Sequence, residues 1–213
     1  MQREKSMKNI IQPGHPLIKT LVTRLRNLET DSYTFRKTLS ELARLLLYEA
    51  LKDEKTEEIN IKLWSGSGNF PYIKGERYVF IPVLRAGLPM LDGVLGAVPE
   101  ASAGFLAIKR DEKTLKSTVY YDRVPPLKGK TAFILDPMVA TGGSLDHAIS
   151  VVKGKKPDRI FTLNVIGAPD GVRRVCENHP DITMVIAQVD EKLDNNGYIL
   201  PGLGDAGDRA FNT

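Results

Sequence analysis

The sequence predicts an α/β fold in which a mostly parallel, twisted sheet is flanked by helices. Apolar runs of strand length alternate along the chain with segments whose apolar residues recur at helical intervals. The runs 78–84 and 131–135 are apolar almost throughout, which is typical of parallel strands covered on both faces. This alternation favours a mostly parallel sheet with helices on both faces.

Two helices are expected before the sheet. Apolar residues repeat at helical intervals over 17–28, and a second helix is predicted from the capping residues Asp31 and Ser32 to Ala50. We expect this N-terminal helical pair to serve packing and subunit contact. An alternating strand at 58–64 then leads into a glycine-rich loop, 65–69, which predicts a small β-arm or hood.

The sheet units follow the arm in order. Strands are predicted at 78–84, 104–108, 118–121, 131–135, 159–166 and 183–189, and helices at 88–98, 145–152 and 171–177. The excursion around the strand 118–121 is long, so residues 110–121 are a candidate lid. The stretch 198–208 is too rich in glycine for regular structure.

Composition indicates a soluble protein with one domain spanning residues 1–213, of which 42% are hydrophobic and 26% charged. The net charge of +4 is dispersed along the chain and mixed with acidic residues, which argues against a nucleic-acid or membrane partner. A single cysteine, Cys176, fits a reducing compartment. The charged N-terminus and the lack of a long apolar run predict a cytoplasmic protein.

Several motif matches fail because their context is wrong. Residues 202–207 fit G-x-G-x-x-G, but no helix and strand follow them to complete a dinucleotide-binding unit. Residues 129–131 resemble the end of a Walker loop, yet they enter a strand instead of leaving one. His15, His147 and His179 have no ligand partner at metal spacing, so no protein metal site is predicted.

The segment 136–144 is the strongest candidate for chemistry. A buried strand is followed by Asp136, then by a small-residue loop ending in Thr-Gly-Gly-Ser, then by a helix. Glycines let backbone N–H groups converge, and the helix N-terminus adds partial positive charge, so the loop suits a phosphate. The alternative interpretation is an ordinary strand-to-helix turn with Ser144 as N-cap.

Two arginines are expected at the same edge of the sheet as this loop. Arg85 follows one predicted strand and Arg110 another, and open α/β sheets bind ligands at the carboxyl ends of their strands. Each arginine alone is typical of a surface or ion-pair residue. Together they suit a pyrophosphate.

Three motifs resemble the uracil phosphoribosyltransferase family. They are 82–87 (Pro-Val-Leu-Arg-Ala-Gly), 136–144 (Asp-Pro-Met-Val-Ala-Thr-Gly-Gly-Ser) and 197–208 (Gly-Tyr-Ile-Leu-Pro-Gly-Leu-Gly-Asp-Ala-Gly-Asp), of which the last is the most specific. The resemblance runs from about residue 15 to residue 211. It implies a phosphoribosyltransferase-like fold and the reaction of uracil with 5-phosphoribosyl 1-pyrophosphate (PRPP), giving UMP and pyrophosphate in UMP salvage.

The resemblance also implies roles for individual residues. Catalytic roles fall to Asp136, Arg85 and Arg110, with Asp136 facing the ribose and the arginines facing the pyrophosphate. Binding of PRPP is implied for Arg85, Arg110, Asp136, Pro137, Met138, Val139, Ala140, Thr141, Gly142, Gly143, Ser144 and Asp205. Binding of uracil, largely through main-chain groups, is implied for Ile199, Gly204, Asp205 and Ala206.

Cofactors, assembly and alternatives follow from the same resemblance. Magnesium is expected with PRPP, GTP as an effector, and a homodimer or homotetramer as the assembly. One alternative is a phosphoribosyltransferase-like regulator that binds RNA of pyrimidine genes, for which a clustered basic face is expected. Another is an enzyme for a different base.

Overall fold

The computed structural model describes residues 9–110 and 117–213, with the side chains of 109, 110 and 117 left out. A nine-stranded sheet forms its centre, with the strand order β1-β11-β10-β8-β4-β6-β7; β5 pairs with β4 and β9 with β10. The pairs are parallel except for β6 with β7, which confirms the mostly parallel α/β sheet.

The strands of the sheet lie close to the predicted ranges. They are β1 Ile10–Ile11, β4 Tyr78–Leu84, β5 Ser102–Ala103, β6 Leu106–Arg110, β7 Ser117–Asp122, β8 Thr131–Leu135, β9 Met138–Val139, β10 Arg159–Gly167 and β11 Thr183–Val189. The β4 and β8 strands pair from Tyr78 opposite Thr131 to Pro82 opposite Leu135. Their carboxyl ends therefore lie side by side.

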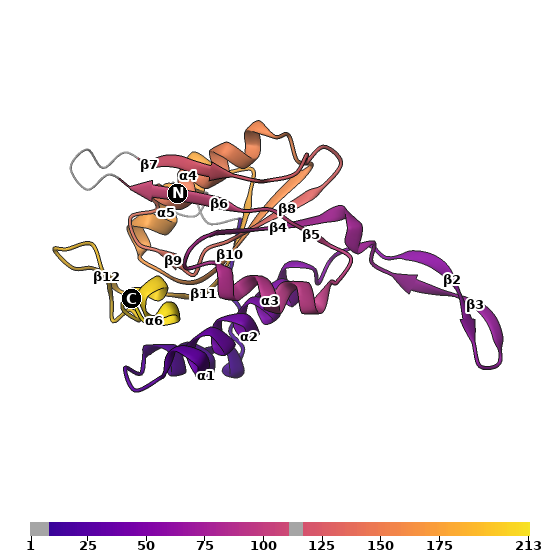
Figure 1. Cartoon of the computed structure of the whole chain (residues 1–213), viewed down its shortest axis with the longest axis horizontal. Helices are drawn as coiled ribbons and strands as arrows, with labels where there is room; N and C mark the ends of the chain where they lie inside the picture. The colour runs from indigo at the N-terminus through magenta and orange to yellow at the C-terminus, as the bar shows by residue number, and fades with distance from the viewer. Residues whose placement is uncertain (1–8, 111–116) are drawn as a thin grey trace, which may run out of the picture.

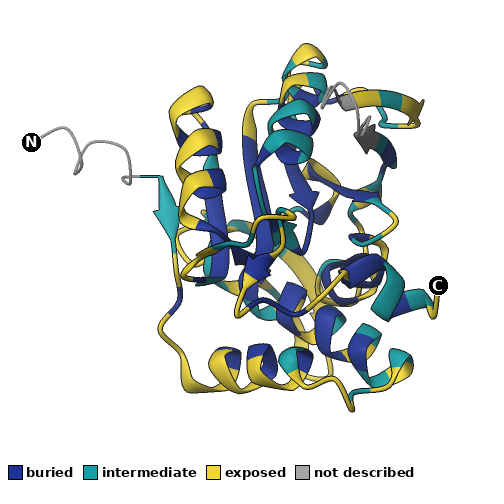
Figure 2. Ribbon diagram, turned by 90° about the vertical axis from the view of Figure 1, so that its left-hand side faces the viewer, coloured by how far each residue is buried: buried dark blue, intermediate teal, exposed yellow. Residues whose placement is uncertain are grey.

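Helices cover both faces of the sheet (Figures 1 and 2). The helices are α1 Pro16–Arg26, α2 Ser32–Ala50, α3 Leu88–Ala97, α4 Gly143–Gly154, α5 Pro169–Asn178 and α6 Ala206–Phe211, with a short 3₁₀ turn at Gly75–Arg77. One hydrophobic core packs α1, α2, α3 and α6 on one face, and a second packs α4 and α5 on the other. Consecutive residues of β4, such as Phe80 and Ile81, enter opposite cores. The predicted N-terminal helical pair is present, and Asp31 caps α2 by accepting a hydrogen bond from the Thr34 N–H.

A two-stranded ribbon projects from the body of the protein (Figure 1). It consists of β2 Glu57–Leu63 and β3 Gly66–Tyr72, paired antiparallel. The β-arm is therefore present, but the prediction of a loop at 65–69 is wrong for most of its length, because 66–69 belong to β3. The connection is the turn at Trp64 and Ser65.

The C-terminal stretch is more regular than its glycine content predicted. Two short antiparallel strands, β12 Lys192–Leu193 and β13 Ile199–Leu200, precede α6. Asp205 caps α6 by accepting a hydrogen bond from the Asp208 N–H at 2.9 Å. In the described ranges, no helix is long and apolar enough to cross a membrane.

Candidate active site

The carboxyl ends of neighbouring strands bring the predicted site residues to one edge. Arg85 directly follows β4 and Asp136 directly follows β8, and these strands are paired. A Cβ atom added to Gly87 would collide with the Leu135 carbonyl oxygen, so the turn after Arg85 rests on the end of β8. Arg85 and Asp136 therefore lie at adjoining positions on one edge of the sheet.

The backbone of Arg110 also lies at this edge. Arg110 is the last residue of β6, which runs parallel to β4. Of the candidate lid, 110–121, residues 111–116 lie outside the described residues. The rest forms the end of β6 and most of β7, which pair antiparallel.

The loop after Asp136 has the form expected of an anion cradle. We use "cradle" for residues 136–144. Gly142 adopts φ +77°, a left-handed conformation that favours glycine, and α4 begins at the next residue without a side-chain cap. Ser144 lies inside the first turn, so its interpretation as N-cap is wrong. The first N–H groups of a helix lack intrahelical acceptors, and here the capping residue is a glycine, which has no side chain to accept from them.

Helix α5 forms the wall behind the cradle. A Cβ atom on Gly171 would collide with the Ala140 carbonyl oxygen and lie 3.0 Å from the Gly142 nitrogen. A Cβ atom on Gly142 would lie 2.7 Å from the Gly171 carbonyl oxygen. Backbone therefore packs directly on backbone, which fixes the shape of the cradle without side chains.

The carboxyl group of Asp136 lies in a desolvated position. The residue is only 8% exposed, and its Oδ1 accepts a long hydrogen bond of 3.4 Å from the Met138 N–H. Burial disfavours the charged form and raises the pKa of Asp136 from 3.8 to about 7. Near neutral pH this carboxyl therefore exchanges between its neutral and charged forms.

A buried polar pair in β10 holds the peptide of Asp136 from behind. Asn164 donates from Nδ2 to the Asp136 carbonyl oxygen at 2.7 Å, and Thr162 donates to Asn164 Oδ1 at 2.8 Å. Both residues are fully buried. Sequence reasoning missed this pair, because it lies within a run that otherwise reads as apolar sheet core.

The C-terminal segment closes the site near Arg85. The guanidinium of Arg85 donates to Asp208 Oδ1 at 3.0 Å and to Thr213 Oγ1 at 3.1 Å. A Cβ atom on Gly207 would lie 3.8 Å from Arg85 Nη2 and 3.2 Å from Asp205 Oδ1. The predicted site residues Arg85 and Asp205 are thus brought together at the start of α6, and Asp208 joins them unpredicted.

The proposed uracil contacts lie on the same segment. Ile199 is buried in β13, and Ala206 is buried at the start of α6. Gly204, between them, adopts φ +77° and is exposed. The segment therefore presents main-chain groups from both a strand end and a helix start.

Arg174 is a further cation that sequence reasoning did not single out. It lies on α5, and its Nη1 is 3.9 Å from the position of a Cβ atom on Gly143 of the cradle. Neighbouring Arg173 pairs with Asp170 instead. Only the packing of α5 on the cradle identifies Arg174.

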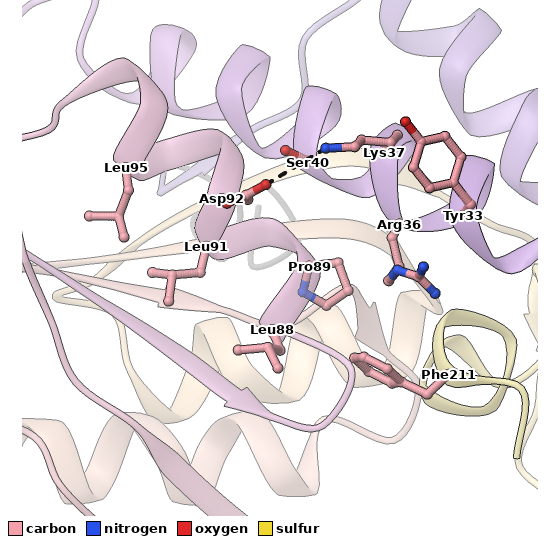
Figure 3. A pocket seen from close by; sticks show the side chains of 10 residues that line it. All are labelled: Tyr33, Arg36, Lys37, Ser40, Leu88, Pro89, Leu91, Asp92, Leu95 and Phe211. Carbon is pink, nitrogen blue, oxygen red and sulfur yellow. Dashed lines mark ion pairs between the residues drawn. The ribbon is translucent and has the colours of Figure 1, made fainter.

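Among the surface hollows outside the cradle, two are lined in part by Leu88 of α3. One, of about 480 Å³, opens between α2, α3 and α6, where Tyr33, Arg36 and Phe211 line it (Figure 3). The other, of about 550 Å³, includes Arg85 and Tyr121 at the edge of the sheet. The second hollow adjoins the predicted pyrophosphate side of the site.

Within the described ranges, no group of three His, Cys, Asp or Glu side chains is placed to hold a metal ion.

The fold is one that solved phosphoribosyltransferases share. A solved purine phosphoribosyltransferase from Pyrococcus horikoshii shares the fold, with a TM-score of 0.50 at 18% identity over 72% of this chain and 84% of that chain. The family model for uracil phosphoribosyltransferase matches residues 12–213, and the chain belongs to that family.

Individual relatives agree with the family model. A uracil phosphoribosyltransferase from Aquifex aeolicus is 46% identical over 95% of this chain and 97% of its own, and one from Malacoplasma penetrans is 44% identical over 93% and 97%. A solved protein structure from Aquifex aeolicus, 46% identical, superimposes with a TM-score of 0.92 over 95% of this chain and 97% of that chain.

Proposed function

We propose that the protein transfers the 5-phosphoribosyl group of PRPP to uracil, giving UMP and pyrophosphate in pyrimidine salvage. Membership of the uracil phosphoribosyltransferase family over residues 12–213 carries this proposal. The bond from ribose C1′ to pyrophosphate breaks, and uracil N1 forms the new bond to C1′ with loss of its proton. The transition state therefore carries positive charge on the ribose and negative charge on the leaving group.

The cradle is the proposed site of the 5′-phosphate. The uncapped first turn of α4 and the left-handed Gly142 support this placement, because both direct N–H groups toward one point. The hydroxyls of Thr141 and Ser144 add donors. Asp136, at the other end of the cradle, then faces the ribose, where its charged form stabilises the developing cation.

Arg85 and Arg110 are the proposed partners of the leaving pyrophosphate. The Arg85–Asp208 ion pair is exposed on both sides, at 57% and 49%, so it contributes only about 0–1 kcal/mol. The guanidinium can therefore exchange Asp208 for phosphate oxygens at small cost. Arginine suits these oxygens because its planar fork donates two parallel hydrogen bonds.

Residues 199–206, which we term the base-reading segment, are the proposed uracil site. Uracil offers acceptor, donor and acceptor groups along O2, N3–H and O4. Main-chain groups of Ile199, Gly204 and Ala206 can present the complementary set, with Asp205 placed between the base and the phosphoribosyl side. Cytosine reverses the pattern at N3 and C4, and each unpaired buried group costs about 1–3 kcal/mol.

Magnesium is proposed to arrive with PRPP. Carboxyl oxygens are the ligands that Mg²⁺ prefers in proteins, and Asp205, which is exposed at the start of α6, places one carboxyl at the site. This residue fits an ion that takes its remaining ligands from the substrate and water. Bound there, Mg²⁺ would offset negative charge on the pyrophosphate.

Assembly and regulation are proposed from family resemblance together with the exposed arm. We propose a homodimer or homotetramer, a GTP effector and a cytoplasmic location. The assembly is supported by apolar side chains exposed along β2 and β3, including Ile61, Phe70 and, at the turn, Trp64, which is 101% exposed. Such a row of exposed apolar residues favours burial against another subunit.

A panel of free bases tests the proposed reaction. Purified protein, PRPP and Mg²⁺ are incubated with uracil, cytosine, hypoxanthine, guanine or orotate, and pyrophosphate release is followed. Release with uracil alone is expected. Preferred use of another base would replace the proposal, and binding of structured RNA in a gel shift without uracil turnover would favour the regulator instead.

A further inference from the structure

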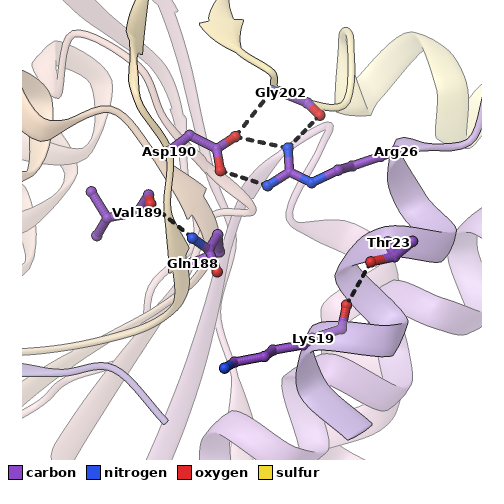
Figure 4. A network of polar contacts seen from close by, with 7 residues as sticks. All are labelled: Lys19, Thr23, Arg26, Gln188, Val189, Asp190 and Gly202. Atoms are coloured by element: carbon purple, nitrogen blue, oxygen red, sulfur yellow. Dashed lines mark hydrogen bonds and ion pairs between the residues drawn. The ribbon is translucent and has the colours of Figure 1, made fainter. Parts of the chain in front are cut away.

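An ion pair with a buried carboxylate lies behind the base-reading segment. Arg26, the last residue of α1, forks onto Asp190, which directly follows β11 (Figure 4). Arg26 Nη2 lies 2.5 Å from Asp190 Oδ1, and Nη1 lies 2.8 Å from Oδ2. A helix at the start of the chain is thus joined to the end of the sheet beside the site.

Both main-chain polar groups of Gly202 form hydrogen bonds with this pair. The Gly202 N–H donates to Asp190 Oδ2 at 3.0 Å, and Arg26 Nη1 donates to the Gly202 carbonyl oxygen at 2.7 Å. Gly202 has φ +64°, and a Cβ atom there would collide with the Ile199 carbonyl oxygen. A shift of Gly202 would therefore displace Ile199, which the proposed function places against uracil.

Arg209 ties the same segment to the same helix a second time. Its Nη1 donates to the Leu203 carbonyl oxygen at 2.9 Å and also to that of Leu25, and its Nη2 donates to that of Asn27 at 2.6 Å. The guanidinium lies 4.5 Å from the centre of the Phe35 ring. Arg209 thereby donates hydrogen bonds to carbonyl groups at the end of α1 and holds Leu203 in place relative to this helix.

The burial of the pair indicates a role in geometry. The Asp190 side chain is 2% exposed and that of Arg26 is 23% exposed. Apolar side chains of similar size would fill such a position without the cost of desolvating two charges. The ion pair instead fixes the relative orientation of the two side chains, because a guanidinium and a carboxylate form two parallel hydrogen bonds in few alternative geometries.

We propose that Arg26 and Asp190 are positioning residues that hold the base-reading segment in the geometry that recognises uracil. The inference rests on the proposed placement of uracil at 199–206. Recognition through main-chain groups has no side chain that can adjust, so the segment itself must be fixed. A displacement of about 1 Å costs as much as about 100-fold in rate.

The variant Arg26→Lys tests the proposal. Lysine keeps the charge but cannot hold both Asp190 oxygens and the Gly202 carbonyl oxygen in the same fork. We expect the KM for uracil to rise about 10- to 100-fold and the preference for uracil over cytosine to narrow, with the KM for PRPP within about twofold of wild type. Arg24→Lys, in the same last turn but exposed, is the matched control. It should leave the KM for uracil, the KM for PRPP and the preference for uracil over cytosine unchanged.

Other outcomes overturn the proposal. A KM for uracil in Arg26→Lys equal to that in Arg24→Lys would remove the positioning role. Equal rises in the KM for uracil and the KM for PRPP, or a fall in kcat alone, would also remove it. If Arg26→Lys does not fold, Asp190→Asn is measured instead, since its amide oxygen still accepts the Gly202 N–H, and the same split in KM is required. A wild-type protein that uses a base other than uracil would refute the proposed function, whereas normal uracil turnover with an unchanged Arg26→Lys refutes only the positioning role.

Discussion

Replacing Asp136 by asparagine is expected to stabilise the fold and to impair the reaction. The side chain is 8% exposed, and burial raises the pKa of Asp136 from 3.8 to about 7. Asparagine keeps the size of the side chain and an oxygen that accepts the Met138 N–H, but it cannot carry a charge. The substitution therefore removes both the cost of burying the charge and the use of that charge in catalysis.

The sign and size of the stability change follow from the pKa of Asp136. Because the folded pKa is higher than the unfolded one, the stability that the neutral carboxyl gives is fully present below pH 3.8 and is lost as the pH rises through about 7. The pKa difference corresponds to roughly 4 kcal/mol as an upper limit. Local relaxation reduces such penalties. We therefore expect the free energy of unfolding of the Asp136→Asn protein to exceed that of wild type by about 1–3 kcal/mol above pH 7.

Urea unfolding and turnover, each measured from about pH 4 to about pH 8, test this reasoning. The gain in stability should vanish at the acid end, and wild-type kcat should rise with pH as Asp136 ionises. The variant should lose about 100-fold in kcat, with a flat profile in this range. Asp170→Asn, at a side chain that is 80% exposed, is the control. If the free energies of unfolding of wild type and Asp136→Asn differ by the same amount at every pH, or if the variant keeps the wild-type kcat, the proposed role of the Asp136 charge is refuted.

Three further changes test other parts of the structure. Gly171→Ala should cost about 1–3 kcal/mol in urea unfolding and raise the KM for PRPP, because a methyl group there meets the cradle backbone; wild-type values would contradict the close packing of α5. Arg174→Ala should raise the KM for PRPP about 3- to 10-fold, more at low salt than at high salt, whereas Arg173→Ala should not; equal effects would remove Arg174 from the site. Trp64→Ser, at the exposed tip of the arm, should shift the assembly toward smaller species in sedimentation velocity without lowering the melting temperature, and an unchanged assembly would exclude the tip from subunit contact.

Buried elements of the sheet could be predicted from the sequence because burial leaves a local pattern. The strands Thr131–Leu135 and Thr183–Val189 have the predicted bounds, since apolar side chains must cover both faces of each strand. Exposed elements leave a weaker pattern. The β3 strand begins with four polar or glycine positions in a row and is defined by pairing with β2, including the Asn60–Asn69 side-chain hydrogen bond of 2.9 Å.

The C-terminal segment shows a different limit. Helix α6 has six residues, too few for a helical period to be read, and its start is marked only by the capping carboxylate of Asp205. The β12–β13 pair is shorter still. The prediction that the glycine content excludes regular structure is wrong here, because glycines at positive φ, such as Gly204, connect short regular elements instead of replacing them.

The site could be predicted where its residues follow strands directly. Asp136 and Arg85 meet because the parallel strands before them are neighbours, and this order follows from alternating strands and helices. Contacts across the fold carry no such signal. Arg26 and Asp190 are 164 residues apart, and Arg174 reaches the cradle only through the packing of α5. No periodicity or spacing in the sequence encodes either contact.

A crystal structure of the protein with UMP bound tests the central claim most directly. We expect the 5′-phosphate within hydrogen-bonding distance of the backbone N–H groups of 141–144, and the pyrimidine ring against the main chain of 199–206. Asp136 should face the ribose hydroxyls between them. A phosphate held by Arg85, or a pyrimidine ring outside the base-reading segment, would contradict it.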